Sequence, residues 1–189
     1  STITVTPEFT YNGVACNGPS KDFVITVNPS LDIVPPANQS ICDGLTTAAV
    51  NFISNNTGGT VNYSWTNDNT SIGLPPSGSG AILPFLAVNS GATLQTATIT
   101  VTASYSNAGQ TCDSTETFLI SVSPSPVATI SGLNNYLVCE NDTPPFITFE
   151  GSNGTAPYTF TYQINSDPVQ QVVSSGTSNT ATISVSTIN

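Results

Sequence analysis

The chain has 189 residues, with one Lys or Arg, eleven Asp or Glu and no His, which gives a formal net charge of −10. This acidic balance repels phosphate backbones and anionic membrane surfaces, so we expect no nucleic acid partner. Apolar residues make up 38% of the chain and alternate with Ser, Thr and Asn, which predicts a folded protein rather than a disordered one. We find no apolar run long enough to cross a bilayer, so membrane insertion is not expected either.

The first predicted strands lie at residues 3–6 and 23–27, where β-branched or aromatic residues alternate with small polar ones. A turn near Gly13 would join them as a hairpin. We assign residues 1–29 to the last two strands of one β-sandwich unit.

Residues 30–126 are predicted to form a complete unit of the same kind, with strands at 48–53, 61–65, 96–102 and 118–122. The predicted core comprises the aromatic residues Phe52, Tyr63, Trp65 and Phe118. Alternation places Val61, Tyr63 and Trp65 on one face of their strand, which favours burial of the tryptophan over an exposed sugar-stacking role.

Residues 127–189 form the third predicted unit, a divergent repeat with strands at 146–149, 158–162 and 181–185. Its final strand pair is expected to be missing, so the sequence looks like a window from a longer array. Proline-containing linkers at 28–30 and 123–126 separate the units. Proline favours extended backbone there, which predicts a semi-rigid rod.

Segments of the first unit recur in the second at a spacing typical of one immunoglobulin-like domain. Residues 3–6 (ITVT) recur at 99–102, Cys16 recurs as Cys112, and residues 23–30 recur at 118–125. Residues 39–44 have a looser echo at 136–141. The predicted fold is therefore all-β, with tandem immunoglobulin-like sandwiches.

The order of motifs in the second unit resembles the PKD-like repeats of giant Bacteroidetes cell-surface adhesins, including gliding-motility adhesins. The resemblance is carried by residues 38–44 (NQSICDG), 63–74 (YSWTNDNTSIGL), 78–85 (GSGAILPF) and 97–102 (ATITVT), followed by Gly109, Cys112 and residues 118–124. Residues 138–145 (VCENDTPP) and 154–160 (GTAPYTF) resemble a second repeat type of the same proteins. The resemblance implies a β-sandwich fold, type IX secretion and a place on the bacterial cell surface.

We expect no enzyme activity. Without His, and with Lys21 as the one basic residue, no Ser, Thr or Cys has a basic partner to activate it. Paired carboxylates are the remaining route to acid–base chemistry, but Asp and Glu are scattered singly along the chain. No cofactor is expected.

Two acidic turns are weak candidates for Ca²⁺, because carboxylate and amide oxygens are its preferred ligands. They comprise Asn67, Asp68 and Asn69 in one turn, and Glu140 and Asp142 in another. Neither has the regular ligand spacing of a calcium loop. Ordinary Asx turns explain both clusters more simply.

The four cysteines recur with the repeat and lack CxxC spacing, which favours disulfides in an oxidising compartment. We favour the Cys42–Cys112 pair within the complete unit, although strand polarity would place these residues at opposite ends of a sandwich. Cys16–Cys42 with Cys112–Cys139 is the alternative, and pairing with units beyond this sequence is a third. The run Asp113-Ser114-Thr115 resembles the O-glycosylation motif of the same bacterial phylum, which makes Ser114 a candidate.

Three functions from different classes remain. The first is a structural stalk segment of a long extracellular adhesin or filament, whose partners are neighbouring repeats. The second is an accessory module that binds glycans or protein through exposed aromatics, for which Phe9, Tyr11, Tyr105 and Tyr136 lie near turns. The third is a fibre subunit that assembles by strand complementation, because an incomplete sandwich exposes sheet edges.

Overall fold

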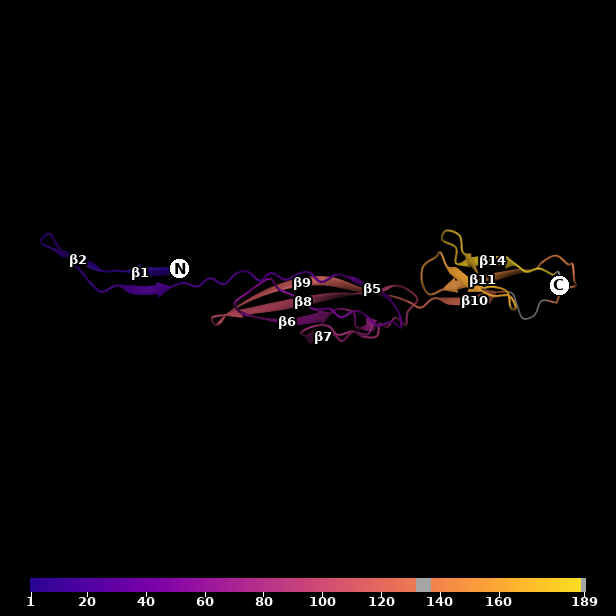
Figure 1. Cartoon of the computed structure of the whole chain (residues 1–189), viewed down its shortest axis with the longest axis horizontal. Helices are drawn as coiled ribbons and strands as arrows, with labels where there is room; N and C mark the ends of the chain where they lie inside the picture. The colour runs from indigo at the N-terminus through magenta and orange to yellow at the C-terminus, as the bar shows by residue number, and fades with distance from the viewer. Residues whose placement is uncertain (132–136, 188–189) are drawn as a thin grey trace.

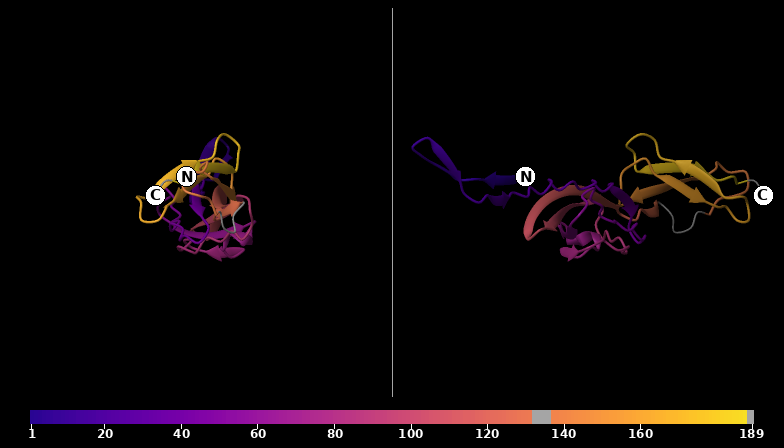
Figure 2. Two further views of the ribbon diagram at one scale, coloured as in Figure 1. Left: turned by 90° about the vertical axis from the view of Figure 1, so that its right-hand side faces the viewer. Right: turned by 60° about the vertical axis from the view of Figure 1, so that its left-hand side comes forward.

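The computed structural model describes residues 1–131 and 137–187, and this part of the chain is all-β, as predicted. It has fourteen strands and one short 3-10 turn, and no α-helix occurs in the described ranges. The strands fall into an N-terminal ribbon, a middle sandwich and a C-terminal sandwich, arranged one after another along the long axis (Figure 1). Viewed along that axis, the three parts lie behind one another (Figure 2).

The N-terminal ribbon (residues 1–27) is a long, twisted hairpin that stands free of the rest of the chain. Strand β1 (Thr2–Val5) pairs with β4 (Lys21–Val24), and β2 (Glu8–Tyr11) pairs with β3 (Val14–Asn17). The turn uses left-handed backbone at Asn12 and Gly13, with φ of 51° and 79°, which suits the twist of a two-residue hairpin loop. All sixteen strand residues are exposed.

The middle sandwich is built on a five-stranded sheet with the order β5-β9-β8-β6-β7. The elements are β5 (Gln39–Cys42), β6 (Thr60–Asn67), the 3-10 turn η1 (Thr70–Ile72), β7 (Ser77–Ser79), β8 (Gln95–Asn107) and β9 (Gln110–Ser123). Strands β8 and β9 form a long hairpin, whereas β5 runs parallel to β9 along the sheet edge.

The second layer of this sandwich consists of extended segments joined by isolated bridges, at Ile33–Ser54, Thr46–Leu86 and Val50–Ile82. The continuous strand predicted at residues 48–53 is therefore wrong. The side chain of Gln39 explains part of the difference, because its amide bonds both the N–H and the carbonyl of Ala48, each at 3.1 Å. A side chain thus takes the place of a neighbouring strand at that residue.

The core of the middle sandwich lies between these two layers. Trp65 and Phe118 are buried in it, with 7% and 2% of their surface exposed. Phe52 packs against the same cluster, and its ring centroid lies 5.6 Å from that of the half-buried Tyr63. The aliphatic members come from both layers, among them Val50, Ile72, Ile82, Ile99 and Ile120.

The C-terminal sandwich has two smaller sheets. One has the order β10-β11-β14, formed by β10 (Val127–Ser131), β11 (Phe146–Ser152) and β14 (Thr180–Ser184); the other pairs β12 (Thr159–Tyr162) with β13 (Gln170–Val173). Phe149, Phe160 and Ala181 are buried between the two sheets. This core is much smaller than that of the middle sandwich, so more of its apolar surface meets solvent.

Several pairs of facing residues in the N-terminal ribbon are equivalent to facing pairs in the β8–β9 hairpin, although the ribbon register shifts by one residue between its two strand pairs and the hairpin register does not. Ile3 lies opposite Phe23 in the ribbon, as Ile99 lies opposite Phe118 in the hairpin. Phe9 likewise faces Cys16, as Tyr105 faces Cys112. Similar sequence in the two segments is therefore matched by equivalent strand pairing.

Candidate functional site

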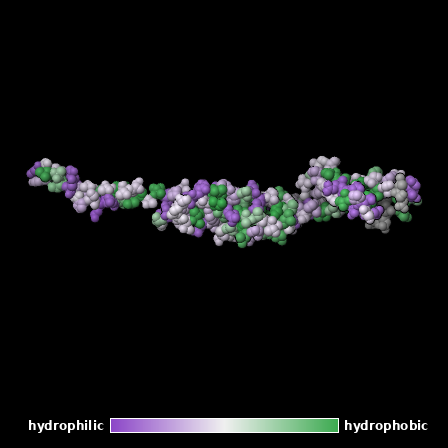
Figure 3. All heavy atoms as spheres, viewed as in Figure 1, coloured by the Kyte–Doolittle hydropathy of each residue, from purple (hydrophilic) through white to green (hydrophobic). Residues whose placement is uncertain are grey.

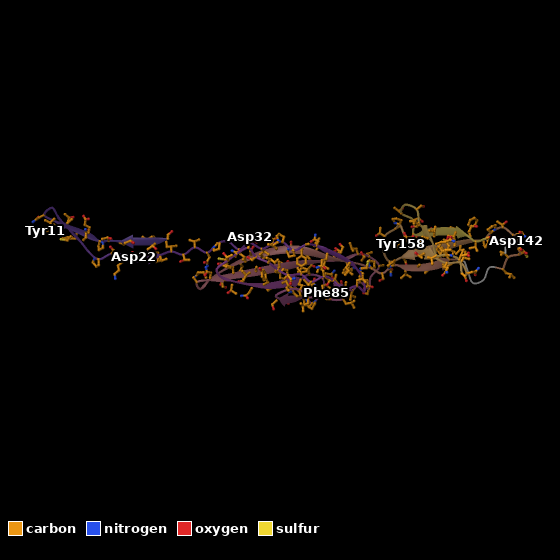
Figure 4. The ribbon with its side chains drawn as sticks, in the orientation of Figure 1. Tyr11, Asp22, Asp32, Phe85, Asp142 and Tyr158 are labelled. Carbon is orange, nitrogen blue, oxygen red and sulfur yellow. The ribbon has the colours of Figure 1, made fainter. Side chains whose placement is uncertain are left out.

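The acidic side chains are spread along the molecule rather than gathered in one cleft. Asp22 lies on the ribbon, Asp32 beside the middle sandwich and Asp142 at the far end of the C-terminal sandwich (Figure 4). Within the described ranges, no group of three or more Cys, Asp or Glu side chains could hold a metal ion.

The turn at Asn67–Asn69 organises its own backbone. The Oδ1 atom of Asn67 accepts the N–H of Asn69 at 3.0 Å, and Oδ1 of Asp68 accepts the N–H of Thr98 at 2.7 Å. Asn69 caps the 3-10 turn, because its Oδ1 accepts the N–H of Ser71 at 3.2 Å. The hydrogen bonds of these three oxygens connect β6, the 3-10 turn and β8. Such bonds from Asn and Asp side chains to nearby backbone are typical of Asx turns.

The second acidic turn has a similar internal arrangement. The Oδ2 atom of Asp142 accepts the N–H of Cys139 at 2.9 Å, and its carbonyl accepts the hydroxyl of Thr187 at 2.6 Å. Asn141 has a positive φ of 65°, which is typical of a tight turn. Glu140 is exposed beside it. The turn thus fastens the end of the C-terminal sandwich.

The favoured Cys42–Cys112 disulfide does not form in this structure. All four cysteines are free thiols. Cys42 lies opposite Ser123 at the end of β9, whereas Cys112 lies near the start of β9, opposite Tyr105. An extended strand rises about 3.3 Å per residue, so the two thiols are tens of ångströms apart, far beyond the reach of one bond.

Two further predicted surface residues have unexpected environments. Ser114 is half-buried within β9, on the same face as Phe118 rather than in an open loop. Tyr105 is 1% exposed and donates its hydroxyl to the carbonyl of Thr57 at 3.0 Å, so it cannot offer a ring to a glycan. Phe9 and Tyr11 are each 67% exposed on the ribbon. Tyr136 lies outside the described residues.

The joint between the ribbon and the middle sandwich is held by two asparagines. Nδ2 of Asn28 donates to the carbonyl of Asn107, and Nδ2 of Asn107 donates to Oδ1 of Asn28, both at 3.2 Å. Asn107 ends β8 beside the hairpin turn. The linker is therefore fixed to the tip of the β8–β9 hairpin by a reciprocal pair.

The joint between the two sandwiches is organised around the buried Asn89. Its Nδ2 donates to the carbonyls of Val122 and Thr93, at 2.7 and 2.9 Å, and its Oδ1 accepts the N–H of Gly91 at 3.0 Å. The loop shaped in this way presents the carbonyl of Ala92. That carbonyl accepts the N–H of Gly154 from the C-terminal sandwich at 3.0 Å.

Asp43 adds a second fastening at this joint. Its Oδ1 accepts the N–H of Asn89 at 2.8 Å, and its Oδ2 accepts the hydroxyl of Ser125 in the linker at 3.2 Å. Sequence reasoning missed Asp43, Asn89 and Asn107. The linker prolines gave the positions of the joints, but nothing in the sequence distinguished these side chains from other loop Asn and Asp residues.

A groove of about 520 Å³ runs along the joint between the sandwiches. Leu94, the linker prolines and the 153–159 loop line it, and Tyr158 lies on its C-terminal side (Figure 4). A Cβ at Gly151 would come within 2.5 Å of the Tyr158 ring, so that ring is packed against its own sandwich. The groove is thus a consequence of how the two bodies meet.

No family model matches the chain, and no curated protein matches it. Over the described residues, we find no helix whose length and hydrophobicity would suit a membrane crossing.

Proposed function

We propose that this chain is a non-catalytic spacer, a stalk segment of a long extracellular adhesin or filament on the bacterial cell surface. The observation that carries the proposal is the end-to-end arrangement of the three parts, with side chains fastening each joint (Figure 1). A stalk has to keep its length, and joints fixed by hydrogen bonds resist bending. Its partners in this role are neighbouring repeats of the same long protein, and a contribution to gliding motility follows from the resemblance alone.

The strand order of the middle sandwich also suits a load-bearing role. Tension along the molecule enters before β5 and leaves after β9, and these strands run parallel along one ladder. Pulling on the two ends therefore shears the ladder, so all of its hydrogen bonds bear the load together. Two contacts extend the ladder: the N–H of Leu119 bonds Oδ1 of Asn38, and the N–H of Asp43 bonds the carbonyl of Ser123, both at 2.8 Å.

Single-molecule stretching of the 189-residue chain tests the spacer role. We expect Asn38→Ala to lower the unfolding force of the middle sandwich, because it removes one bond from the sheared ladder. Asn62→Ala is the matched control, since Asn62 is exposed on β6, away from β5 and β9. Equal unfolding forces for Asn38→Ala and Asn62→Ala would contradict the load path through β5 and β9. If the wild-type chain extends under force without any unfolding step, as a disordered chain does, the spacer function itself is contradicted.

A further inference from the structure

Strand β9 of the middle sandwich has an open edge over its N-terminal half. The backbone groups of a strand point alternately to its two sides, so every second residue of β9 points away from β8. Toward the end of β9 these groups have partners, because the N–H of Leu119 bonds Asn38 and the carbonyl of Ser123 accepts the N–H of Asp43. The same alternation continues back through four exposed residues: Thr111, Asp113, Thr115 and Thr117. Among the described residues, no hydrogen bond reaches the outward N–H and C=O groups of these four, which we call the open edge.

The edge is open because the chain changes layers just before β5. Ile33 bridges Ser54 in the second layer, whereas Asn38 already bonds β9. Pro35 and Pro36 lie between them, and proline has no N–H to give to a neighbouring strand. Strand β5 therefore pairs only with the part of β9 nearer the C-terminal sandwich (Figure 1). The open edge thus belongs to the sandwich in the middle of the chain, which has a neighbour at each end.

The open edge has the length of an ordinary strand. Residues 111–117 span about 20 Å, at about 3.3 Å per residue. Their unpaired backbone groups form a template on which another strand can add. On the face seen in Figure 3, hydrophilic and hydrophobic residues are interspersed over the middle sandwich. A strand added here is therefore held by backbone hydrogen bonds and charge more than by a large apolar contact.

Glu116 gives the open edge a chemical preference. It faces the core side of the sheet, as Phe118 does, and lies half-buried opposite Val101. Its carboxylate makes no hydrogen bond or ion pair within the described part of the chain. Residues 30–126 contain no Lys, Arg or His, so the middle sandwich has no cation of its own to pair with it. A Lys or Arg on an added strand would supply that partner, because opposite charges on neighbouring strands attract.

We propose that the open edge of β9 binds an extended basic peptide segment of another protein, which adds to the sheet as a further strand. Its backbone pairs with residues 111–117, and a Lys or Arg on its core-facing side meets Glu116. An acidic or uncharged strand leaves this inward carboxylate unpaired, so Glu116 selects against such strands. A second copy of this chain fits poorly for the same reason, because its open edge brings Asp113 and Glu116 against their like. This lateral contact goes beyond the spacer function and does not rest on it.

Peptide binding to the 189-residue chain tests the backbone and the charge separately. The probe is a blocked, fluorescently labelled peptide of about eight residues in which Thr alternates with Lys. We expect fluorescence anisotropy to show binding that weakens as salt is added. A peptide with Glu in place of Lys should bind at least roughly tenfold more weakly, because it places like charges on neighbouring strands. The Thr-Lys peptide with methylated backbone nitrogens keeps its charge but cannot donate hydrogen bonds to β9, so it should lose binding as well.

Two substitutions test the role of Glu116. Glu116→Gln and Asp167→Asn each remove one negative charge and keep the shape of the side chain, and Asp167 is exposed in the C-terminal sandwich, away from β9. Glu116→Gln should weaken binding of the Thr-Lys peptide by roughly threefold to tenfold. Asp167→Asn should leave binding close to wild type. Trp65 fluorescence checks that both variants are folded, and the peptide comparisons on the wild-type chain need neither variant.

Residue-resolved hydrogen exchange identifies the strand that accepts the peptide. In the free chain, the amides of the four open-edge residues should exchange faster than those of the residues between them, which bond β8. Saturating Thr-Lys peptide should slow exchange at these four amides. The proposal is overturned by no binding at millimolar peptide, by equal affinities of the three peptides, by equal effects of the two substitutions, or by protection elsewhere than β9. Protection of β9 by self-association without peptide would assign the edge to a second copy and overturn it too. None of these outcomes bears on the load path, because β5 pairs with the other half of β9.

Discussion

At the residue scale, ionisation of the Tyr63 phenol is linked to the stability of the middle sandwich. Burial raises the pKa of Tyr63 above its ordinary value of 10.0, and a hydrogen bond with Ser54 opposes part of that rise. A raised pKa means that the folded state holds the proton more tightly than the unfolded chain does. This contribution to stability is therefore complete below pH 10 and is lost as the pH rises through the folded-state pKa.

We predict that the free energy of unfolding falls as the pH rises above about 10, and that Tyr63→Phe reduces this fall. Urea titrations at a series of alkaline pH values measure the effect. Tyr11→Phe is the control, because Tyr11 lies on the exposed ribbon, outside the middle sandwich. The account of Tyr63 is wrong if the wild type and Tyr63→Phe lose stability in parallel over this range.

At the scale of elements, the contact of β7 with β6 depends on the absence of a side chain. A Cβ at Gly78 would lie 2.3 Å from the Trp65 ring, which is itself 7% exposed and shares the core with Ile99 and Phe118. We predict that Gly78→Ala lowers the free energy of unfolding by about 1–3 kcal/mol, because the ring or the strand has to move. Denaturant unfolding followed by Trp65 fluorescence measures this change.

The neighbouring Ser79→Ala supplies the comparison for that variant. Ser79 is exposed at the end of β7, so its substitution should change the stability by less than about 0.5 kcal/mol. A similar loss of stability in Gly78→Ala and Ser79→Ala would show that any alanine in β7 is destabilising, whether or not it contacts Trp65. A negligible loss for Gly78→Ala would show that Trp65 is not confined by β7.

The elements also show how far the sequence predicts the fold. Along β8 and β9, more buried residues alternate with more exposed ones, and this local signal locates the strands predicted at residues 96–102 and 118–122. Both strands are longer in the structure than predicted. The 48–53 segment alternates as well, but the distant Gln39 side chain bonds the backbone of Ala48, and no local pattern reveals such a contact. The favoured Cys42–Cys112 pair is wrong for the reason that strand polarity already indicated, because Cys42 lies opposite Ser123 at one end of β9 and Cys112 lies near the other end.

The contacts at the two joints between the parts of the chain were the least predictable from the sequence. The linker prolines are visible in the sequence, but Asn89 acts through a buried bond to the carbonyl of Val122, a residue far along the chain. The Asn28–Asn107 pair likewise joins residues that only the folded hairpin brings together. In the two predicted calcium turns, side-chain oxygens of Asn67, Asp68 and Asp142 accept backbone N–H groups, and the partner of Asp68 is the distant Thr98.

At the scale of the whole molecule, we propose that the chain is an extended spacer with fixed joints. Proline limits the backbone of the 123–126 linker, and the Asp43–Ser125 hydrogen bond fastens this linker to the middle sandwich. The Ala92–Gly154 hydrogen bond joins the two sandwiches directly. A chain with these constraints should keep one elongated shape in solution. Replacing Pro124 and Pro126 with Gly should loosen the joint and broaden the distribution of shapes.

Small-angle X-ray scattering of the 189-residue chain, at concentrations where its mass is 19.5 kDa, measures whether the chain keeps this elongated shape. We predict an asymmetric distance distribution with a long tail, typical of a rod, whose maximum dimension agrees with the end-to-end arrangement in Figure 1. The variant with Gly at positions 124 and 126 should give a broader distribution. A bell-shaped distribution typical of a compact globule for the wild-type chain would contradict the account.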